Sequence, residues 1–208
     1  MEEKFEHNVF VVDDDESMRV ALAHLFKSMN LRVDVFGTAT AFLTTKRPNI
    51  ASCLVLDIRL PGLSGLEAQD MLAKTGVHIP IVFMTGHGDI PMSVKAMKAG
   101  AIDFLPKPFR DQDMLDAVMR ALDQDRRRRD EEKAISQLQH LFETLTQRER
   151  EVLPLVISGL MNKQIAHRLE ISEITVKIHR GHLMKKLEAR SLADLVRMAE
   201  ILGIKRTN

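Results

Sequence analysis

The sequence predicts two domains, a doubly wound α/β domain and an all-helical domain, joined by a long helical linker. Over residues 9–107, short apolar runs alternate with longer segments of helical periodicity, which is typical of a parallel sheet wrapped by helices. Beyond residue 110 only helical periodicity remains. The charge changes too: residues 1–121 hold 13 Lys+Arg and 16 Asp+Glu, whereas residues 144–208 hold 12 and 7. A basic helical domain favours nucleic acid as its partner.

The strands of the first domain are expected near residues 9–12, 31–36, 53–56, 79–84 and 101–104. The central runs are apolar at consecutive positions, as expected of strands that helices cover on both faces. Helical spacing separates them, for example at Val20, Leu22, Leu25, Phe26 and Met29. Five strands and five helices in about 120 residues predict a flavodoxin-like (βα)5 domain. We assign residues 1–122 to it.

The next segment, residues 123–143, is helical and strongly charged. Residues 123–132 contain no apolar side chain, and apolar positions resume at Ile135. We interpret the segment as a long exposed helix that joins the domains, with pairing to a second copy as an option. The run Arg126–Arg129 is flanked by acids, which favours a solvated linker face over a contact with DNA.

The last domain, residues 144–208, is predicted to hold four short helices. Thr146 and Glu149 form a capping box that opens the first, which ends at Gly159. A second helix is expected over residues 161–169. Ser172 starts a third and Ser191 a fourth, which runs to Leu202. Four short helices with a net charge of +5 suit a helix-turn-helix module.

Polar side chains mark the carboxyl ends of four predicted strands, where ligands bind in open α/β sheets. They are Asp13–Asp15, Asp57, Thr85 and Lys107. Carboxylates are suitable ligands for Mg²⁺, which takes one or two of them together with waters and phosphate oxygens. We expect Asp14 and Asp57 to ligate the ion, or Mn²⁺ in its place, with Asp13 holding a bound water.

That chemistry would let Asp57 attack a phosphoryl group and form an aspartyl phosphate. Lys107 would pair with one phosphate oxygen and the Thr85 hydroxyl would donate to another. An acidic loop without function is the simpler interpretation of Asp13–Asp15 alone. The matching positions of Asp57, Thr85 and Lys107 argue against it.

The helix that begins after Ser172 is the candidate for reading DNA. One face is formed by Val176, His179, Leu183 and Leu187, which should pack inward. The outward residues, including Thr175, Lys177, Ile178 and Arg180, would reach the major groove, with Lys177 and Arg180 contacting bases or phosphates. We expect Asn162, Lys163, Lys185 and Lys186 to contact the sugar-phosphate backbone of the DNA. The helix from Ser191 would be a dimer contact, which predicts an operator with inverted half-sites.

Residues 7–122 resemble the receiver domain of two-component response regulators. The motifs are Val-Val-Asp13-Asp14-Asp15, Leu-Asp57-Ile-Arg-Leu-Pro61-Gly62, Phe-Met-Thr85-Gly and Phe104-Leu-Pro-Lys107-Pro108-Phe. The resemblance implies that Asp57 is the phosphoacceptor and that Asp13, Asp14 and the Arg59 backbone carbonyl complete the metal site. It also implies that Thr85 and Phe104 form a switch pair and that the Lys107–Pro108 bond is cis.

Residues 144–204 resemble the LuxR/NarL-type helix-turn-helix, through Leu160–Ala166, Ile171–Arg180 and Met184–Leu187. The stretch Thr85–Ala101 is similar to the group around the nitrogen-fixation regulator FixJ, a style that styrene- and toluene-responsive regulators share. Gly181 departs from relatives that carry a cation there, so one base contact would be missing.

These resemblances imply a response regulator phosphorylated on Asp57 by a sensor histidine kinase with Mg²⁺. The switch would act on a dimeric DNA-binding transcription factor, an activator that works with RNA polymerase on double-stranded promoter DNA. Arg59 and His87 would tune the lifetime of the phosphoryl group. We expect no enzymatic turnover beyond slow self-phosphorylation and autodephosphorylation at Asp57. We also expect a cytoplasmic protein, since no apolar run approaches the ~18–20 residues of a membrane span.

Two other interpretations remain open. A haloacid-dehalogenase-type phosphohydrolase also uses an Asp nucleophile and Mg²⁺, but its chemistry favours an acid two residues beyond the nucleophile, where this chain has Arg59. A DNA-binding protein for which phosphorylation is dispensable is the second, and the intact acidic cluster argues against it.

Overall fold

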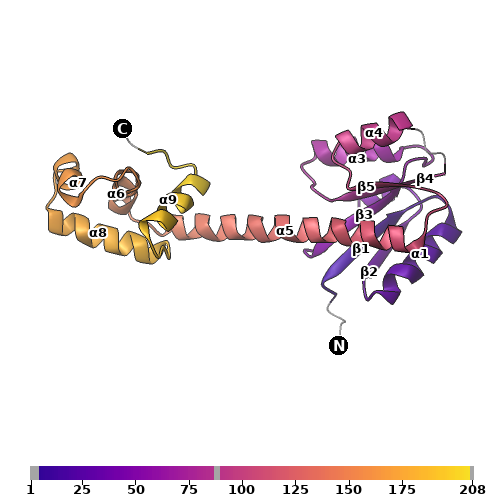
Figure 1. The fold of residues 1–208 in the computed structure, drawn as a ribbon, viewed down its shortest axis with the longest axis horizontal. Helices are drawn as coiled ribbons and strands as arrows, with labels where there is room; N and C mark the ends of the chain where they lie inside the picture. The colour runs from indigo at the N-terminus through magenta and orange to yellow at the C-terminus, as the bar shows by residue number, and fades with distance from the viewer. Residues whose placement is uncertain (1–4, 87–89, 207–208) are drawn as a thin grey trace. The chain divides into compact units, whose positions relative to one another are not determined.

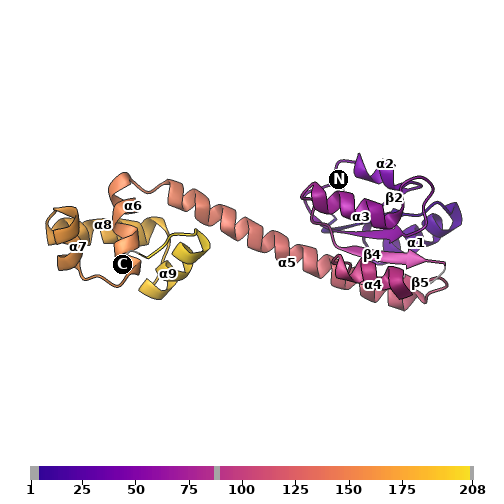
Figure 2. The same ribbon diagram turned by 90° about the horizontal axis from the view of Figure 1, so that it is seen from above.

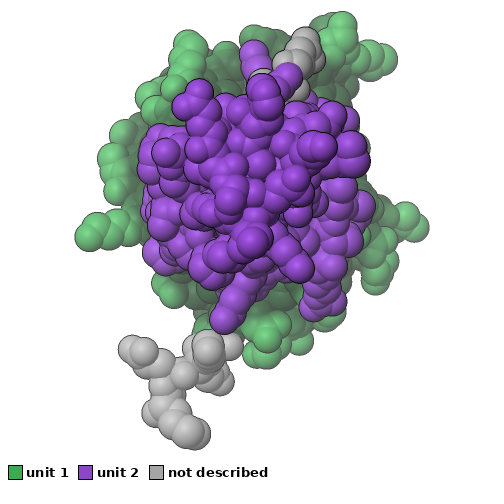
Figure 3. Space-filling view, turned by 90° about the vertical axis from the view of Figure 1, so that its left-hand side faces the viewer, with its two compact units in different colours: residues 1–129 green, residues 130–208 purple. Residues whose placement is uncertain are grey.

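The computed structural model describes residues 5–86 and 90–206. The chain forms two compact units, residues 1–129 and 130–208 (Figure 3).

The first unit is built on a five-stranded parallel sheet with the order β2-β1-β3-β4-β5 (Figure 1). The strands are β1 (His7–Val12), β2 (Arg32–Phe36), β3 (Ala51–Asp57), β4 (Ile81–Thr85) and β5 (Asp103–Pro106). The connecting helices are α1 (Glu16–Ser28), α2 (Ala39–Leu43), α3 (Gly65–Lys74), α4 (Ile90–Lys98) and α5 (Asp111–Glu143). This order and these parallel pairings confirm the flavodoxin-like prediction.

Helices cover both faces of this sheet (Figure 2). On one face α1 and α5 bury Phe26 and Met114 against Val9 and Val55. On the other face α2, α3 and α4 pack on the opposite side chains of the same strands, where Phe10 lies 5.3 Å from Phe42 between ring centroids. Both faces of β3 are therefore buried, which explains its unbroken apolar run.

The last strand begins two residues later than its apolar run predicts. Ala101 and Ile102 are apolar because they pack in the connection before the strand, on opposite faces of the sheet. Gly100 opens that connection with φ +90°, a conformation that favours glycine.

The linker prediction is confirmed as a continuous helix, since α5 runs for 33 residues. The solvated interpretation of Arg126–Arg129 is wrong for its second half. Arg128 and Arg129 each bond to the Asp125 carboxylate at 2.6 Å, and Arg129 also donates to Asn49 Oδ1 at 2.8 Å. Asp125 is 1% exposed and accepts the Ser52 backbone N–H at 2.9 Å. This part of α5 is thus fixed to the start of β3.

The second unit holds α6 (Gln147–Ile157), α7 (Asn162–Leu169), α8 (Glu173–Lys186) and α9 (Leu192–Ile201). The predicted capping box of Thr146 and Glu149 is present, and Ser172 and Ser191 cap α8 and α9. The core includes Leu138 near the end of α5, with Leu141 and Phe142 packed against it. These apolar residues of the linker therefore serve the second unit's own core.

Candidate functional site

Three carboxylates meet at the carboxyl end of the sheet. Asp13 follows β1 and Asp57 ends β3, and one oxygen from each, with one from Asp14, lie within 4.8 Å of one another. Lys107 follows β5 and its Nζ lies 2.6 Å from Asp13 Oδ2 and 2.6 Å from Asp57 Oδ2. The structure thus brings together the acids and the lysine that the sequence predicted.

Backbone groups fix the directions of these acids. Asp57 Oδ1 accepts the Arg59 N–H at 2.9 Å, and Asp13 Oδ1 accepts the Asp15 N–H at 2.9 Å. Asp15 itself caps α1 through the Ser17 N–H, so it is held away from the cluster. The carboxylates of Asp13 and Asp57 therefore have a defined orientation before any ligand binds.

Arg19 is a supporting residue that the sequence analysis missed. Its guanidinium donates to the carbonyls of Asp13 at 2.7 Å and Asp14 at 2.9 Å. The available signal was its place on the first turns of the helix that Asp15 caps, which directs a long side chain back over the helix start. Arg19 thus satisfies two backbone acceptors and supports the loop that follows β1.

Burial controls the electrostatics of the cluster. It raises the pKa of Asp13 above its usual value, although the hydrogen bond from Lys107 acts in the opposite direction. Burial also acts to lower the pKa of Lys107, but hydrogen bonds to Asp13 and Asp57 outweigh it, so that the lysine pKa is raised. The ammonium stays charged between two acids, one of them fully buried.

Gly65 is a second residue that the sequence analysis missed. It begins α3 and its N–H donates to Ile58 O at 3.0 Å. A Cβ at this position would lie 2.4 Å from the Asp57 carbonyl oxygen. Only glycine permits this approach between α3 and the end of β3, where Asp57 lies.

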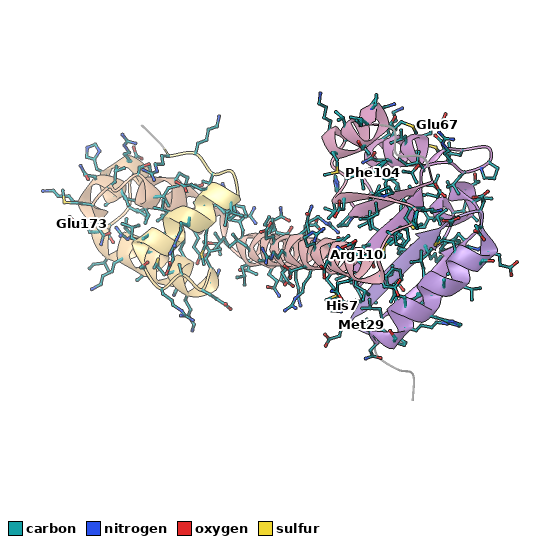
Figure 4. All side chains as sticks on the ribbon, turned by 45° about the vertical axis from the view of Figure 1, so that its right-hand side comes forward. His7, Met29, Glu67, Phe104, Arg110 and Glu173 are labelled. Atoms are coloured by element: carbon teal, nitrogen blue, oxygen red, sulfur yellow. The ribbon has the colours of Figure 1, made fainter. Side chains whose placement is uncertain are left out.

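The predicted switch residues lie on β4 and β5, the two strands beyond β3 in the sheet. Thr85 is 1% exposed, and its carbonyl accepts the Lys107 N–H at 2.7 Å. Phe104 (labelled in Figure 4) is partly buried against the core on the α4 side of the sheet. The Lys107–Pro108 bond is cis, as the resemblance implies. Arg59 is exposed, and His87 lies outside the described residues.

The cluster fits a divalent cation. Asp13 is buried while Asp14 is exposed, which leaves one side open to water. Mg²⁺ keeps several waters and takes one or two carboxylates, so this half-open acid set suits it. Three carboxylates with one ammonium also retain excess negative charge, which a cation would neutralise.

The second unit presents the candidate nucleic-acid interface on α8. Val176, Leu183 and Leu187 are buried, and His179 is partly buried, which confirms the inward face. Lys177 and Ile178 are exposed, the latter at 51%. Ile174, which the sequence analysis did not assign to a contact, is 74% exposed. It follows Glu173, the first residue of the helix, which Figure 4 labels.

Of the remaining residues predicted to contact DNA, some are exposed and others are bonded within the protein. Lys163 and Lys185 are exposed. Arg180 donates to Asn162 Oδ1 at 2.9 Å, which joins α8 to α7. The Thr175 and Ser172 hydroxyls lie 2.8 Å apart. Lys186 turns inward to Glu149, with Nζ 2.7 Å from Oε2.

A doubly wound domain with this acid–lysine cluster, followed by a helix-turn-helix domain, defines a response regulator with a DNA-binding output domain. The chain belongs to this family: residues 9–119 match the response regulator receiver domain, and residues 143–199 match the luxR family of bacterial regulatory proteins.

Relatives extend the match over nearly the whole chain. Nodulation protein W of Bradyrhizobium diazoefficiens is 60% identical, with 94% of this chain and 86% of that protein covered. Response regulator protein TmoT of Ectopseudomonas mendocina is 48% identical, with 93% and 88% covered. Among solved structures, response regulator StyR is 53% identical with a TM-score of 0.85, with 94% of this chain and 98% of that one covered. Full-length FixJ from B. japonicum is 36% identical with a TM-score of 0.58, with 97% and 99% covered.

The transcriptional regulatory protein FixJ of Azorhizobium caulinodans is 44% identical, with 94% of this chain and 93% of that protein covered. These relatives confirm the predicted similarity to the FixJ group. A receiver domain implies a histidine kinase as partner and a luxR-type domain implies DNA binding. Receiver domains bind Mg²⁺ at the acid cluster that Asp13, Asp14 and Asp57 form here. Within residues 5–86 and 90–206, no helix is long and apolar enough to cross a membrane.

Proposed function

We propose that this chain is a transcription factor switched by phosphorylation of Asp57. The observation that carries the proposal is the cluster at the end of β3, where Lys107 Nζ lies 2.6 Å from the Asp57 carboxylate and two further acids lie within 4.8 Å. Asp57 Oδ1 is already held by the Arg59 N–H. Its Oδ2 is the oxygen that points at the ammonium and would meet an incoming phosphoryl group.

The transfer proceeds by attack of an Asp57 oxygen on the phosphorus of a phosphohistidine of the partner kinase. A P–O bond forms, the P–N bond breaks, and the released imidazole takes up a proton. Lys107 moves its ion pair from the carboxylate to a phosphoryl oxygen. Asp13, Asp14, Asp57 and the Arg59 carbonyl would hold Mg²⁺, or Mn²⁺, which supplies charge neutralisation for the phosphoryl oxygens. Slow self-phosphorylation and autodephosphorylation use the same residues, with Arg59 and His87 setting the lifetime.

The signal leaves the cluster through Thr85 and Phe104. Thr85 reaches the phosphoryl oxygen, and Phe104 moves inward toward the face formed by α4, β5 and α5. Phosphorylation shifts this equilibrium only through contacts that differ between the two states. The buried position of Thr85 at the end of β4, beside Lys107, supports the assignment.

The output is binding of a homodimer to a promoter with inverted half-sites, followed by activation of transcription with RNA polymerase in the cytoplasm. Lys177, Ile178 and Arg180 read the major groove with Thr175, while Asn162, Lys163 and Lys185 contact the backbone. The exposed charge of α8 supports this role. In this proposal the receiver domain spans residues 1–122, the helical linker 123–143 and the DNA-binding domain 144–208.

Analytical ultracentrifugation of the full chain with Mg²⁺, with and without beryllofluoride, tests the switch. The chain has no Trp and no Tyr, so that absorbance is read near 230 nm. A monomer that dimerises with beryllofluoride in the wild type, but not in Asp57→Ala, is the expected result. If Asp57→Ala responds to beryllofluoride as the wild type does, phosphorylation of Asp57 is not the switch.

A further inference from the structure

The ammonium of Lys186 is directed into the second unit. It lies near the end of α8 and donates to Glu149 Oε2 at 2.7 Å and to the Thr144 carbonyl at 3.1 Å. The Lys186 side chain is 33% exposed and that of Glu149 is 2% exposed. Lys185, the preceding residue, is exposed. Two adjacent lysines on one helix therefore have different environments.

Glu149 is the centre of this contact. Its Oε2 also accepts the Thr146 N–H at 2.8 Å, as the capping box of α6. Burial acts to raise the pKa of Glu149, but the hydrogen bonds from Lys186 and Thr146 outweigh it and the pKa is lowered. The buried carboxylate is therefore charged, and an adjacent cation is what makes such burial tolerable.

The contact joins three helices. Lys186 belongs to α8, Glu149 lies in the first turn of α6, and Thr144 directly follows the end of α5. Besides Lys186, α8 also brings His182 Nδ1 to 3.7 Å from Glu149 Oε1, with the His182 side chain 62% exposed. The buried contacts of α8 with α6 are apolar, through residues such as Val176 and Leu183. Apolar packing is non-directional and permits small rotations, whereas a charge-assisted hydrogen bond fixes one orientation.

We propose that Lys186 is a positioning residue for the recognition helix and not a phosphate contact. It fixes the rotation of α8 against α6 and the end of α5, and so holds Lys177 and Ile178 in register with the bases. Lys186 comes nine positions after Lys177, about 14 Å along the helix, so the fixed point lies away from the residues that read the bases. The inference rests on the proposed DNA-binding function.

The test compares DNA discrimination with salt dependence in the full chain. A 30-bp duplex is selected from a random pool by the wild type with beryllofluoride and Mg²⁺, and a scrambled duplex of the same composition is the reference. Fluorescence anisotropy measures both affinities over a series of salt concentrations. The variants are Lys186→Ala and Glu149→Gln, with Lys185→Ala as the matched control. Glutamine serves in capping boxes, so Glu149→Gln keeps the start of α6 and removes the charge that holds Lys186.

The expected result is that Lys186→Ala lowers the affinity ratio between the selected and scrambled duplexes about tenfold, a typical loss when hydrogen bonds of a charged group are removed. Its salt slope stays at the wild-type value. Lys185→Ala keeps the ratio and weakens both complexes, with a slope less negative by about 0.9 per subunit, as for one lost phosphate contact. Glu149→Gln lowers the ratio as Lys186→Ala does.

The opposite pattern overturns the inference. If Lys186 binds phosphate, Lys186→Ala reduces the salt slope at an unchanged ratio, and Glu149→Gln strengthens binding to both duplexes because it frees the lysine. Far-UV circular dichroism melts identify a folding defect in Lys186→Ala. In that case Glu149→Gln alone decides, by lowering the affinity ratio or by strengthening binding to both duplexes. If the wild type binds neither duplex in a salt-dependent way, the proposed DNA-binding function fails together with the inference.

Discussion

Two buried carboxylates lie at the opposite ends of β3 and differ in how their charge is balanced. At the start of the strand, Asp125 accepts the Ser52 N–H and bonds to Arg128 and Arg129. At the end of the strand, Asp57 shares a single ammonium, that of Lys107, with Asp13. One acid with two guanidinium groups is more than neutralised, whereas three acids with one ammonium are not.

Burial alone does not mark a reactive acid. Asp125 is 1% exposed and Asp57 is 6% exposed, so the exposed fraction hardly separates them. The oxygens of Asp125 already face three donor groups, and a ligand would have to displace one of them. Asp57 lies in a cluster with excess negative charge and an exposed neighbour, Asp14, which favours a cation and a phosphoryl group.

The largest expected effect is on phosphorylation, for which Asp57 is required and Asp125 is not. We expect Asp57→Ala to abolish labelling by acetyl phosphate, because no oxygen remains to attack the phosphorus. Asp125→Asn leaves the acid cluster intact, because the cluster lies about 20 Å away at the other end of the seven-residue strand. This variant should be labelled to a similar extent as the wild type. Phosphate-affinity gel electrophoresis measures the labelled fraction. Full labelling of Asp57→Ala would show that another residue accepts the phosphoryl group.

The next effect concerns stability, for which Asp125 is the important acid. We expect Asp125→Ala to lower the free energy of unfolding by about 3 kcal/mol, because the Ser52 N–H and two guanidinium groups lose their acceptor. Urea unfolding, followed by far-UV circular dichroism, measures it in the full chain.

The matched control is Asp123→Ala in the same helix. Asp123 pairs with Arg127 at 2.7 Å, and both side chains are more than half exposed, so a loss of about 0–1 kcal/mol is expected. Equal losses for the two variants would mean that Asp125 does not anchor α5 to β3.

A smaller effect comes from the backbone that carries Asp57. We expect Gly65→Ala to destabilise the first unit by about 1–3 kcal/mol, since its Cβ overlaps the Asp57 carbonyl and the loop must shift. The rate of labelling by acetyl phosphate should fall with it. Gly37→Ala is the control, because its Cβ would meet only the Arg19 guanidinium at 3.6 Å. Normal labelling of Gly65→Ala would show that the approach of α3 does not position the acceptor.

Asp57 could be predicted from the sequence and Asp125 could not, for a physical reason. Asp57 ends an apolar run before a Pro-Gly turn, and that local pattern places it at a strand end. Asp125 lies in a charged helical segment that reads as solvated. Its partner Ser52, and Asn49, which accepts from Arg129, are each more than 70 residues away from the group that they bind, and no local pattern reports such a contact.

The same limit applies in the second unit. The capping residues and the inward face of α8 follow from spacing and were predicted. The inward contact of Lys186 was not. At 3.6 residues per turn, Lys185 lies opposite the buried face and Lys186 lies at its border, where a lysine can face either solvent or a neighbouring helix. The contact of Lys186 with Glu149 depends on how α8 packs against α6, 37 residues earlier in the chain.

The smallest expected effect is the response of stability to Mg²⁺. Binding at the acid cluster should raise the free energy of unfolding of the first unit, by about 1.4 kcal/mol at ten times the dissociation constant. We expect the same increment in Asp125→Ala, whose cluster is intact, and a reduced one in Asp57→Ala and Asp13→Asn. Urea titrations with and without Mg²⁺, with Ca²⁺ as a larger competing ion, measure it. If Asp125→Ala abolishes the increment while Asp57→Ala keeps it, the cation binds at the start of β3, and Asp125 rather than Asp57 lies in the cation site.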